Sequence, residues 1–185
     1  ALLNVARGAA TVLLPSDKLE PQVFWQLVEK HCVTNAFTVP TIVKMLVEDP
    51  SVDQFDHSSL RYVIYAGAPM YRADQKRALQ KLGKVLVQYF GLGEVTGCIT
   101  VLTPAMHAAD DTDPNANIGS CGRPRTGMEV AILDENLQPV PAGTVGEICC
   151  RGPGVFAGYF NNPEATAKAF RGGWFHTGDL GRIDA

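Results

Sequence analysis

The first half of the chain alternates between two kinds of apolar pattern, and this alternation limits the fold more than any other feature. Short apolar runs typical of buried strands occur at residues 9–14, 34–39, 61–66 and 84–90. Apolar side chains recur at helical spacing in residues 21–32, a short helix is expected at 40–49, and a surface helix is expected at 71–83. Pro21 suits a first helical turn, and Gly83 suits the position after a last one. Alternating strands and helices predict an α/β fold, a mostly parallel sheet with covering helices.

After residue 103 the pattern changes to short strands between clusters of Pro, Gly, Asn and Asp. Strands are expected at residues 128–134, 146–152 and 173–179, with a helix at 162–170. We therefore expect two parts. Residues 1–103 form an α/β sheet subdomain that is incomplete at its N-terminal side, and residues 104–185 form a turn-rich, β-barrel-like subdomain.

Composition narrows the class of protein. The 185 residues are 46% hydrophobic and 19% charged, as in an ordinary globular protein, and the net charge of -3 comes without a basic run, which argues against nucleic-acid binding. No apolar stretch is long enough for a transmembrane segment and no leader pattern opens the chain, so a cytoplasmic protein is expected. The five cysteines form no C-x-x-C pair and are expected to be reduced thiols.

A glycine-rich stretch follows the last expected strand of the first half, as in many nucleotide-binding loops. Residues 88–97 read QYFGLGEVTG. The dinucleotide fingerprint fails here, because Thr96 occupies the place of the third glycine and Gly97 comes one residue late. A different way of handling phosphate is required.

Two loops follow neighbouring strands of the expected sheet, at the edge where parallel sheets bind ligands. The first is Gly67-Ala68-Pro69, where glycine lets a flat ring approach the main chain. The second contains Phe90, an aromatic face for the other side of a purine, and Glu94, a carboxylate suited to Mg²⁺ beside a triphosphate.

The third element is the stretch WFHTGDLGRID near residue 180. Thr177-Gly178-Asp179 is expected to form a tight turn, and the Asp179 carboxylate suits the two hydroxyls of a ribose. His176 is expected to pack rather than to act in catalysis. Taken singly, each segment keeps another interpretation: Phe90 as a core residue, Glu94 as a solvated carboxylate, and Asp179 as a turn cap.

Order and spacing of the segments carry more information than any one of them. The sequence contains, in order, VTNAFTVPTIVKML, SSLRYVIYAGAPM, QYFGLGEVTG, IGSCGRPRTGMEVAILD, GTVGEICCRGPGVFAGYFNNPEATAKAF and GWFHTGDLGRID. In these motifs, over nearly its whole length, it resembles the adenylate-forming superfamily of acyl-CoA synthetases, peptide-synthetase adenylation domains and luciferases. The resemblance implies an acetyl-CoA synthetase-like fold.

The resemblance also implies a reaction and its participants. Such enzymes join a small-molecule carboxylic acid to the α-phosphate of ATP, with Mg²⁺, and the ligases then transfer the acyl group to coenzyme A. By position in these motifs, the resemblance implies that Gly67, Ala68 and Pro69 contact adenine. It implies that Phe90 stacks on the base, with Gln88, Tyr89 and Gly91 along the same rim. It also implies that Glu94 binds Mg²⁺ and that Asp179 binds the ribose.

Two residues depart from the superfamily pattern, which usually reads Tyr-Gly-x-Thr-Glu where this chain has Phe90 and Gly93. Phe90 lacks a hydroxyl. Gly93 lacks the threonine donor to the phosphate, and removal of one pre-organised donor can reduce a rate by roughly a hundredfold or more.

The superfamily's phosphate loop, mobile C-terminal domain and catalytic lysine have no counterpart in this sequence. We therefore expect an internal fragment of a longer enzyme that forms no adenylate by itself. Exposed edges at its ends would favour association, so a homo-oligomer is left open. The apolar segments FTVPTIVKML and CITVL favour a medium- or long-chain fatty acid. The alternatives are an aryl-acid-CoA ligase, a peptide-synthetase adenylation domain and a non-catalytic nucleotide-binding module.

Overall fold

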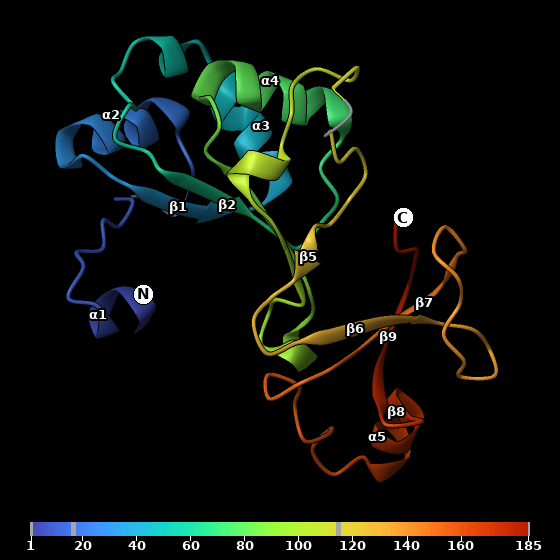
Figure 1. The fold of residues 1–185 in the computed structure, drawn as a ribbon. Coiled ribbons are helices and arrows are strands. Elements are labelled where there is room, and N and C mark those ends of the chain that lie inside the picture. Colours follow the sequence, from blue (N-terminus) through green and yellow to red (C-terminus); the bar gives the residue numbers. More distant parts are fainter. Residues whose placement is uncertain (1, 16–17, 114–115, 185) are drawn as a thin grey trace. The chain divides into compact units, whose positions relative to one another are not determined.

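The computed structural model describes residues 2–15, 18–113 and 116–184 (Figure 1). They fold into two compact units. Unit 1 contains the residues up to Gln88 together with Thr103–Ser120, and unit 2 contains Tyr89–Leu102 together with the residues from Cys121 onward. Among the described helices, none has the length and apolar character needed to cross a membrane.

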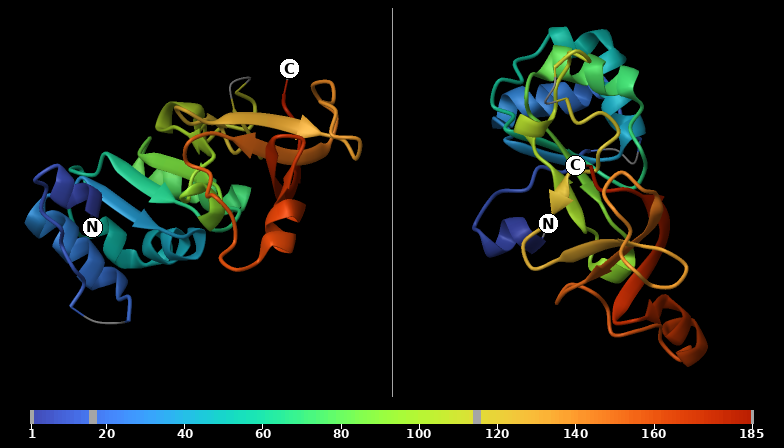
Figure 2. Two further views of the ribbon diagram at one scale, coloured as in Figure 1. Left: turned by 90° about the horizontal axis from the view of Figure 1, so that it is seen from below. Right: turned by 45° about the vertical axis from the view of Figure 1, so that its right-hand side comes forward.

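Unit 1 is the α/β part. Its elements are α1 (Leu2–Ala6), α2 (Pro21–His31), β1 (Asn35–Thr38), α3 (Pro40–Glu48), the single-turn helix η1 (Pro50–Asp53), β2 (Tyr62–Tyr65), α4 (Arg72–Leu82), the first residues of β3 (Leu86–Phe90) and η3 (Pro104–Met106). Strand β1 pairs with β2, and β2 pairs with β3, both in parallel register. The predicted parallel sheet with its helices is confirmed, and α2, α3 and α4 can be followed beside the strands in Figure 2.

The core of unit 1 explains the helical spacing in its sequence. Trp25 of α2 and Val43 of α3 are each 1% exposed and pack in one cluster with Tyr65 of β2 and Leu86 of β3. The indole nitrogen of Trp25 donates a hydrogen bond to the Leu46 carbonyl at 3.0 Å. Burial of these large apolar side chains holds the helices on the sheet.

The strand expected at residues 9–14 does not form. These residues have neither helix nor strand structure, and all of them are exposed, including Val12 and Leu13. A β-strand requires a neighbour that accepts and donates its backbone hydrogen bonds. No described strand of unit 1 pairs with this segment. An apolar run alone was therefore not sufficient to predict a strand.

Unit 2 contains the antiparallel strands. Its elements are the end of β3, η2 (Gly93–Val95), β4 (Thr100–Leu102), β5 (Arg123–Pro124), β6 (Glu129–Leu133), β7 (Gly146–Arg151), α5 (Pro163–Ala169), β8 (Phe170–Arg171) and β9 (Trp174–Gly181). Strands β4 and β5 pair antiparallel, and a second sheet has the antiparallel order β6-β7-β9-β8. The predicted combination of a mostly parallel sheet with a barrel-like antiparallel part is confirmed.

The pairing of β7 with β9 contains an irregularity. Cys149 lies opposite His176, whereas Glu147 lies opposite Leu180. One residue of β7, Ile148, therefore faces three residues of β9, numbers 177–179. The expected tight turn is thus a β-bulge inside β9. Bulges free backbone groups from the ladder and re-aim side chains, and they are common beside active sites.

Candidate active site

The Gly67-Ala68-Pro69 turn lies at the carboxyl end of β2 in unit 1, and all three residues are exposed. Gly67 has φ +84°, in the region that favours glycine. A Cβ atom there would lie 3.9 Å from Cγ1 of Val39, an ordinary contact, so backbone conformation rather than space accounts for the glycine. The turn has the exposed main chain expected of it, and contact with adenine stays a prediction.

Gln88 belongs to a polar network at the end of β3 in unit 1. Its Oε1 lies 3.1 Å from the hydroxyl of Tyr65, which is fully buried and opposite Gln88 in the sheet. The same hydroxyl lies 3.0 Å from Nε2 of His107 and accepts a hydrogen bond from Gln75. Burial raises the pKa of Tyr65 and lowers the pKa of His107, so both side chains are neutral hydrogen-bonding groups at pH 7.

Tyr89, Phe90 and Gly91 lie in unit 2 at the end of β3. Phe90 is half-buried and packs against the core cluster that includes Val95 and Ile99. Gly91 is in close contact with the main chain: a Cβ atom there would lie 2.8 Å from the N and Cα atoms of Cys98. An alanine at this position would force the main chain to shift. Stacking of Phe90 on a base stays a prediction.

Glu94 lies on η2, between the exposed Gly93 and the buried Val95. Its Oε1 accepts a hydrogen bond from the Tyr159 hydroxyl at 3.0 Å, and its backbone carbonyl accepts one from the Phe156 amide at 2.7 Å. The hydrogen bond to Glu94 raises the pKa of the Tyr159 hydroxyl, which therefore stays a donor at neutral pH. A carboxylate has acceptor positions on both oxygens, so Glu94 also fits as one of the few carboxylates that hold Mg²⁺ beside phosphates.

The bulge in β9 carries Asp179, which is exposed. The Thr177 hydroxyl donates to the Ile148 carbonyl at 2.7 Å and accepts from the Asp179 amide at 3.1 Å. The Gly178 amide donates to Oε1 of Glu147 at 3.0 Å. Two side chains therefore replace the ladder hydrogen bonds that the bulge removes.

A cavity of about 400 Å³ in unit 2 borders this bulge. Its lining includes Glu147, Tyr159, His176, Thr177 and Gly178. Tyr159 is the residue whose hydroxyl holds Glu94, so the cavity is bounded both by the bulge and by the partner of Glu94. Within unit 2, the structure thereby relates the two carboxylate-bearing segments that the sequence singled out.

One cluster among the described residues has the composition of a metal site. Ligand atoms of Glu147, Cys149 and His176 lie within 4.8 Å of one another. The guanidinium of Arg171, however, lies 3.0 Å from Nδ1 of His176 and 3.5 Å from Oε2 of Glu147. Burial, followed by the Glu147 carboxylate, also raises the pKa of Cys149 to about 12. The guanidinium thus lies beside two of the three ligand atoms, and the contacts among these side chains form a hydrogen-bonded network. His176 is buried, as expected.

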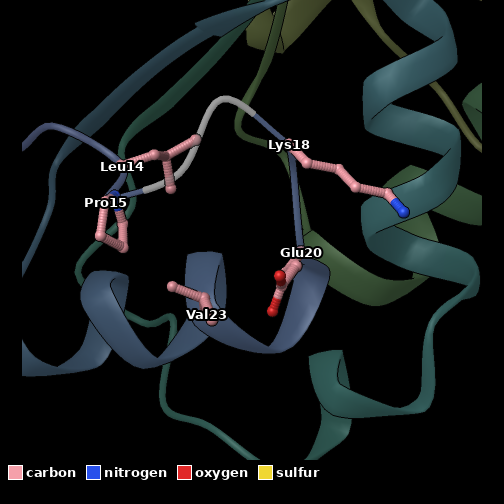
Figure 3. Close-up of a pocket in the computed structure, with 5 residues that line it drawn as sticks. All are labelled: Leu14, Pro15, Lys18, Glu20 and Val23. Carbon is pink, nitrogen blue, oxygen red and sulfur yellow. The ribbon is translucent and has the colours of Figure 1, made fainter.

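A second cavity, in unit 1, has no part in the candidate chemistry. It measures about 70 Å³ and is lined by Leu14, Pro15, Lys18, Glu20 and Val23 (Figure 3). None of these residues was singled out from the sequence. The volume is sufficient for a few water molecules and far smaller than a nucleotide requires.

Sequence reasoning missed Tyr159 and Glu147. Tyr159 lies 65 positions from Glu94 along the chain, and Glu147 lies 31 positions from Gly178. Neither residue has a local pattern that indicates these partners. The motif GTVGEICCRGPGVFAGYFNNPEATAKAF contains both residues, but it indicates the family and not these two contacts.

Comparison with known sequences decides the family. The sequence model of the AMP-binding enzymes matches residues 1–160. The chain belongs to the AMP-binding enzyme family. Membership confirms the resemblance to adenylate-forming enzymes that the six sequence motifs predicted.

Curated proteins of known activity are similar to this chain over nearly its whole length. It is 34% identical over 182 residues to the medium/long-chain-fatty-acid–CoA ligase FadD8 of Mycobacterium tuberculosis, covering 98% of this chain and 30% of that protein. It is 38% identical over 186 residues to 4-coumarate–CoA ligase 5 of Oryza sativa, covering 99% and 33%. The chain thus spans about a third of the length of the curated relatives it matches.

Solved structures have a fold similar to that of this chain. The N-terminal domain of FACL13 from Mycobacterium tuberculosis is similar with a TM-score of 0.84 and 29% identity, over 99% of this chain and 44% of that one. The amide bond synthetase McbA from Marinactinospora thermotolerans has a TM-score of 0.81 and 34% identity, over 91% and 33%. Similarity at this level confirms the fold expected from the sequence.

Proposed function

We propose that this chain is part of an ATP-dependent carboxylate–CoA ligase, which forms an acyl-adenylate and then an acyl-CoA thioester. The observation that supports this most strongly is the link between Glu94 and the bulge of Asp179. Tyr159 donates a hydrogen bond to Glu94 and lines the cavity that Thr177 and Gly178 also line. Glu94 and Asp179 do not themselves line this cavity, but each is hydrogen-bonded to a residue that does, and a metal-binding and a sugar-binding carboxylate on these two segments suit a magnesium nucleotide.

The residues have separate tasks in this proposal. Glu94 binds Mg²⁺, which neutralises phosphate charge when bound, and Asp179 accepts hydrogen bonds from the ribose hydroxyls. The turn at Gly67-Ala68-Pro69 contacts adenine through its exposed main chain, and Phe90 offers its ring to the base, with Gln88, Tyr89 and Gly91 beside it. Such residues accelerate a reaction by positioning and by electrostatic stabilisation of the developing charge.

The chemistry consists of two substitutions. A carboxylate oxygen of the acid forms a bond to the α-phosphorus of ATP while the bond between that phosphorus and the bridging oxygen breaks, and pyrophosphate leaves. The thiol sulfur of coenzyme A then forms a bond to the acyl carbon of the adenylate, the thiol proton passes to a base, and AMP leaves. Because this chain spans about a third of its relatives, we propose that the 185 residues alone do not form the thioester.

For the acid, we propose a medium- or long-chain fatty acid. The apolar segments 37–46 and 98–102 support an apolar substrate, and FadD8 of Mycobacterium tuberculosis bears that substrate class in its name. An aryl acid is the second candidate, favoured by the names 4-coumarate–CoA ligase 5 and feruloyl-CoA synthase among the relatives. A panel of aliphatic and cinnamate-type acids, assayed with the full-length protein that contains this chain, separates the two.

The proposal is tested by thioester formation from ATP, coenzyme A and the best acid of that panel. We expect Glu94→Gln and Asp179→Asn each to reduce the rate by roughly a hundredfold, since each removes a charge that holds the nucleotide. Glu129→Gln is the matched control, because Glu129 is an exposed carboxylate of unit 2 paired with Arg151. Wild-type rates in both site variants would refute the proposed roles. Nucleotide binding without turnover by the wild-type protein would favour a non-catalytic module.

A further inference from the structure

The bulge at residues 177–179 depends on a partner from the neighbouring strand. Three residues of β9 face only Ile148 of β7, so the Gly178 amide has no place in the ladder. It donates instead to Oε1 of Glu147 at 3.0 Å. A backbone N–H without a partner is costly in a folded protein, and Glu147 satisfies this one.

Glu147 is itself held in place. Nδ1 of His176 lies 2.7 Å from its Oε2, and the Arg171 guanidinium lies 3.5 Å from the same oxygen. The Glu147 side chain is 26% exposed, and the His176 side chain is 4% exposed. Both carboxylate oxygens therefore have fixed partners, one on the bulge and one on the buried ring next to it.

The charge of Glu147 strengthens this arrangement. Burial acts to raise the pKa of its carboxyl, but the hydrogen bonds from His176 and Gly178 outweigh burial and lower the pKa below its usual value. Glu147 is therefore ionised at neutral pH. Hydrogen bonds to an ionised acceptor are stronger than those between neutral groups.

We infer that Glu147 is a positioning residue for the nucleotide: by accepting the Gly178 amide, it fixes the bulge that presents Asp179 to the ribose. This inference rests on the proposed role of Asp179. Glu147 itself does not touch the nucleotide in this account. Thr177 also stabilises the bulge, because its hydroxyl donates a hydrogen bond to the Ile148 carbonyl and accepts one from the Asp179 amide.

The test compares two nucleotides in the full-length protein that contains this chain. ATP has both ribose hydroxyls, whereas 2′,3′-dideoxy-ATP has neither. We expect Glu147→Ala to raise KM for ATP by roughly tenfold, the loss expected when one hydrogen bond to a charged group is removed. KM for 2′,3′-dideoxy-ATP should stay within about twofold of wild type, because no ribose hydroxyl is present for Asp179 to hold.

Two further variants complete the design. Glu147→Gln keeps an oxygen acceptor for Gly178 without the charge, and we expect a smaller rise in KM for ATP; it also replaces Glu147→Ala if that variant fails to fold. Glu129→Gln, in a neighbouring strand, should leave KM for both nucleotides unchanged.

The outcomes distinguish this inference from the proposal beneath it. If the wild-type protein has the same KM for both nucleotides, the proposed role of Asp179 fails. If the wild type distinguishes them and the Glu147 variants raise KM equally for both, or for neither, the positioning role of Glu147 is overturned. Slower hydrogen exchange of the Gly178 amide in wild type than in Glu147→Ala is the expected independent result, and equal exchange would count against the inference.

Discussion

Two glycines of one loop should respond in opposite ways to the same substitution. A Cβ atom at Gly91 would lie 2.8 Å from the N and Cα atoms of Cys98 and from the Gly97 carbonyl oxygen, all of them backbone atoms. Ordinary contact begins at 3.4 Å, so the loop would have to open by about 0.6 Å. Adding a methyl group to a packed site in this way costs about 1–3 kcal/mol. We expect Gly91→Ala to lower the free energy of unfolding by about 2 kcal/mol.

The assay is urea denaturation of the chain followed by far-UV circular dichroism. With a urea dependence of about 2 kcal/mol per molar, the midpoint of Gly91→Ala should fall by about 1 M. Gly93→Ala is the matched control, because no described heavy atom lies within 4 Å of a Cβ placed there. Its midpoint should equal or slightly exceed that of wild type, since alanine reduces the entropy of the unfolded chain. Equal midpoints for the two variants would refute the reasoning.

Two further predictions concern position 93 and the buried thiols. No described heavy atom lies within 4 Å of a Cβ placed at Gly93, and we expect Gly93→Thr in the full-length protein to add a phosphate donor. The rate of adenylate formation, measured by pyrophosphate exchange, should rise by up to about a hundredfold. An unchanged rate would contradict this prediction. Burial raises the pKa of Cys149 to about 12 and of Cys150 to about 11. Unfolded thiols ionise near pH 9.0, so the stability that these two thiols contribute should be fully present below that pH and be lost as pH rises through the folded pKa values. Cys149→Ala should make the fall of the urea midpoint shallower, and an identical pH profile would contradict this.

The sequence predicted what local patterns determine. Apolar spacing located α2, since burial of one face is what holds a helix on the sheet, and the glycine at the C-terminal stop position, Gly83, located the end of α4. The apolar pattern failed at residues 9–14, because an apolar run does not reveal whether a neighbouring strand exists to pair with it. The sequence motifs gave the family and marked Glu94 and Asp179 as site residues, roles that stay proposals.

Features that depend on the register between strands could not be predicted from the sequence. An alternating pattern of side chains does not show that Ile148 faces three residues of β9, so the segment at Asp179 was expected as a turn. The hydrogen bonds of Tyr159 to Glu94 and of Glu147 to Gly178 join residues distant in sequence, and only the folded chain brings them together. The boundary expected at residue 103 rests on a change of composition along the chain and stays a prediction; the compact units change over after residues 88, 102 and 120.

The support beneath Gly178 has a consequence for protein engineering. Loops are often exchanged between related enzymes as continuous pieces, but Asp179 shares its scaffold with a carboxylate on another strand. Transplanting residues 176–179 without Glu147 would transfer the Asp179 carboxylate but not the side chain that accepts the Gly178 amide. Deleting Ile148 would shift Glu147 by one place and turn it to the opposite face of the sheet. The segment to transfer is therefore the pair of strands β7 and β9 in their observed register.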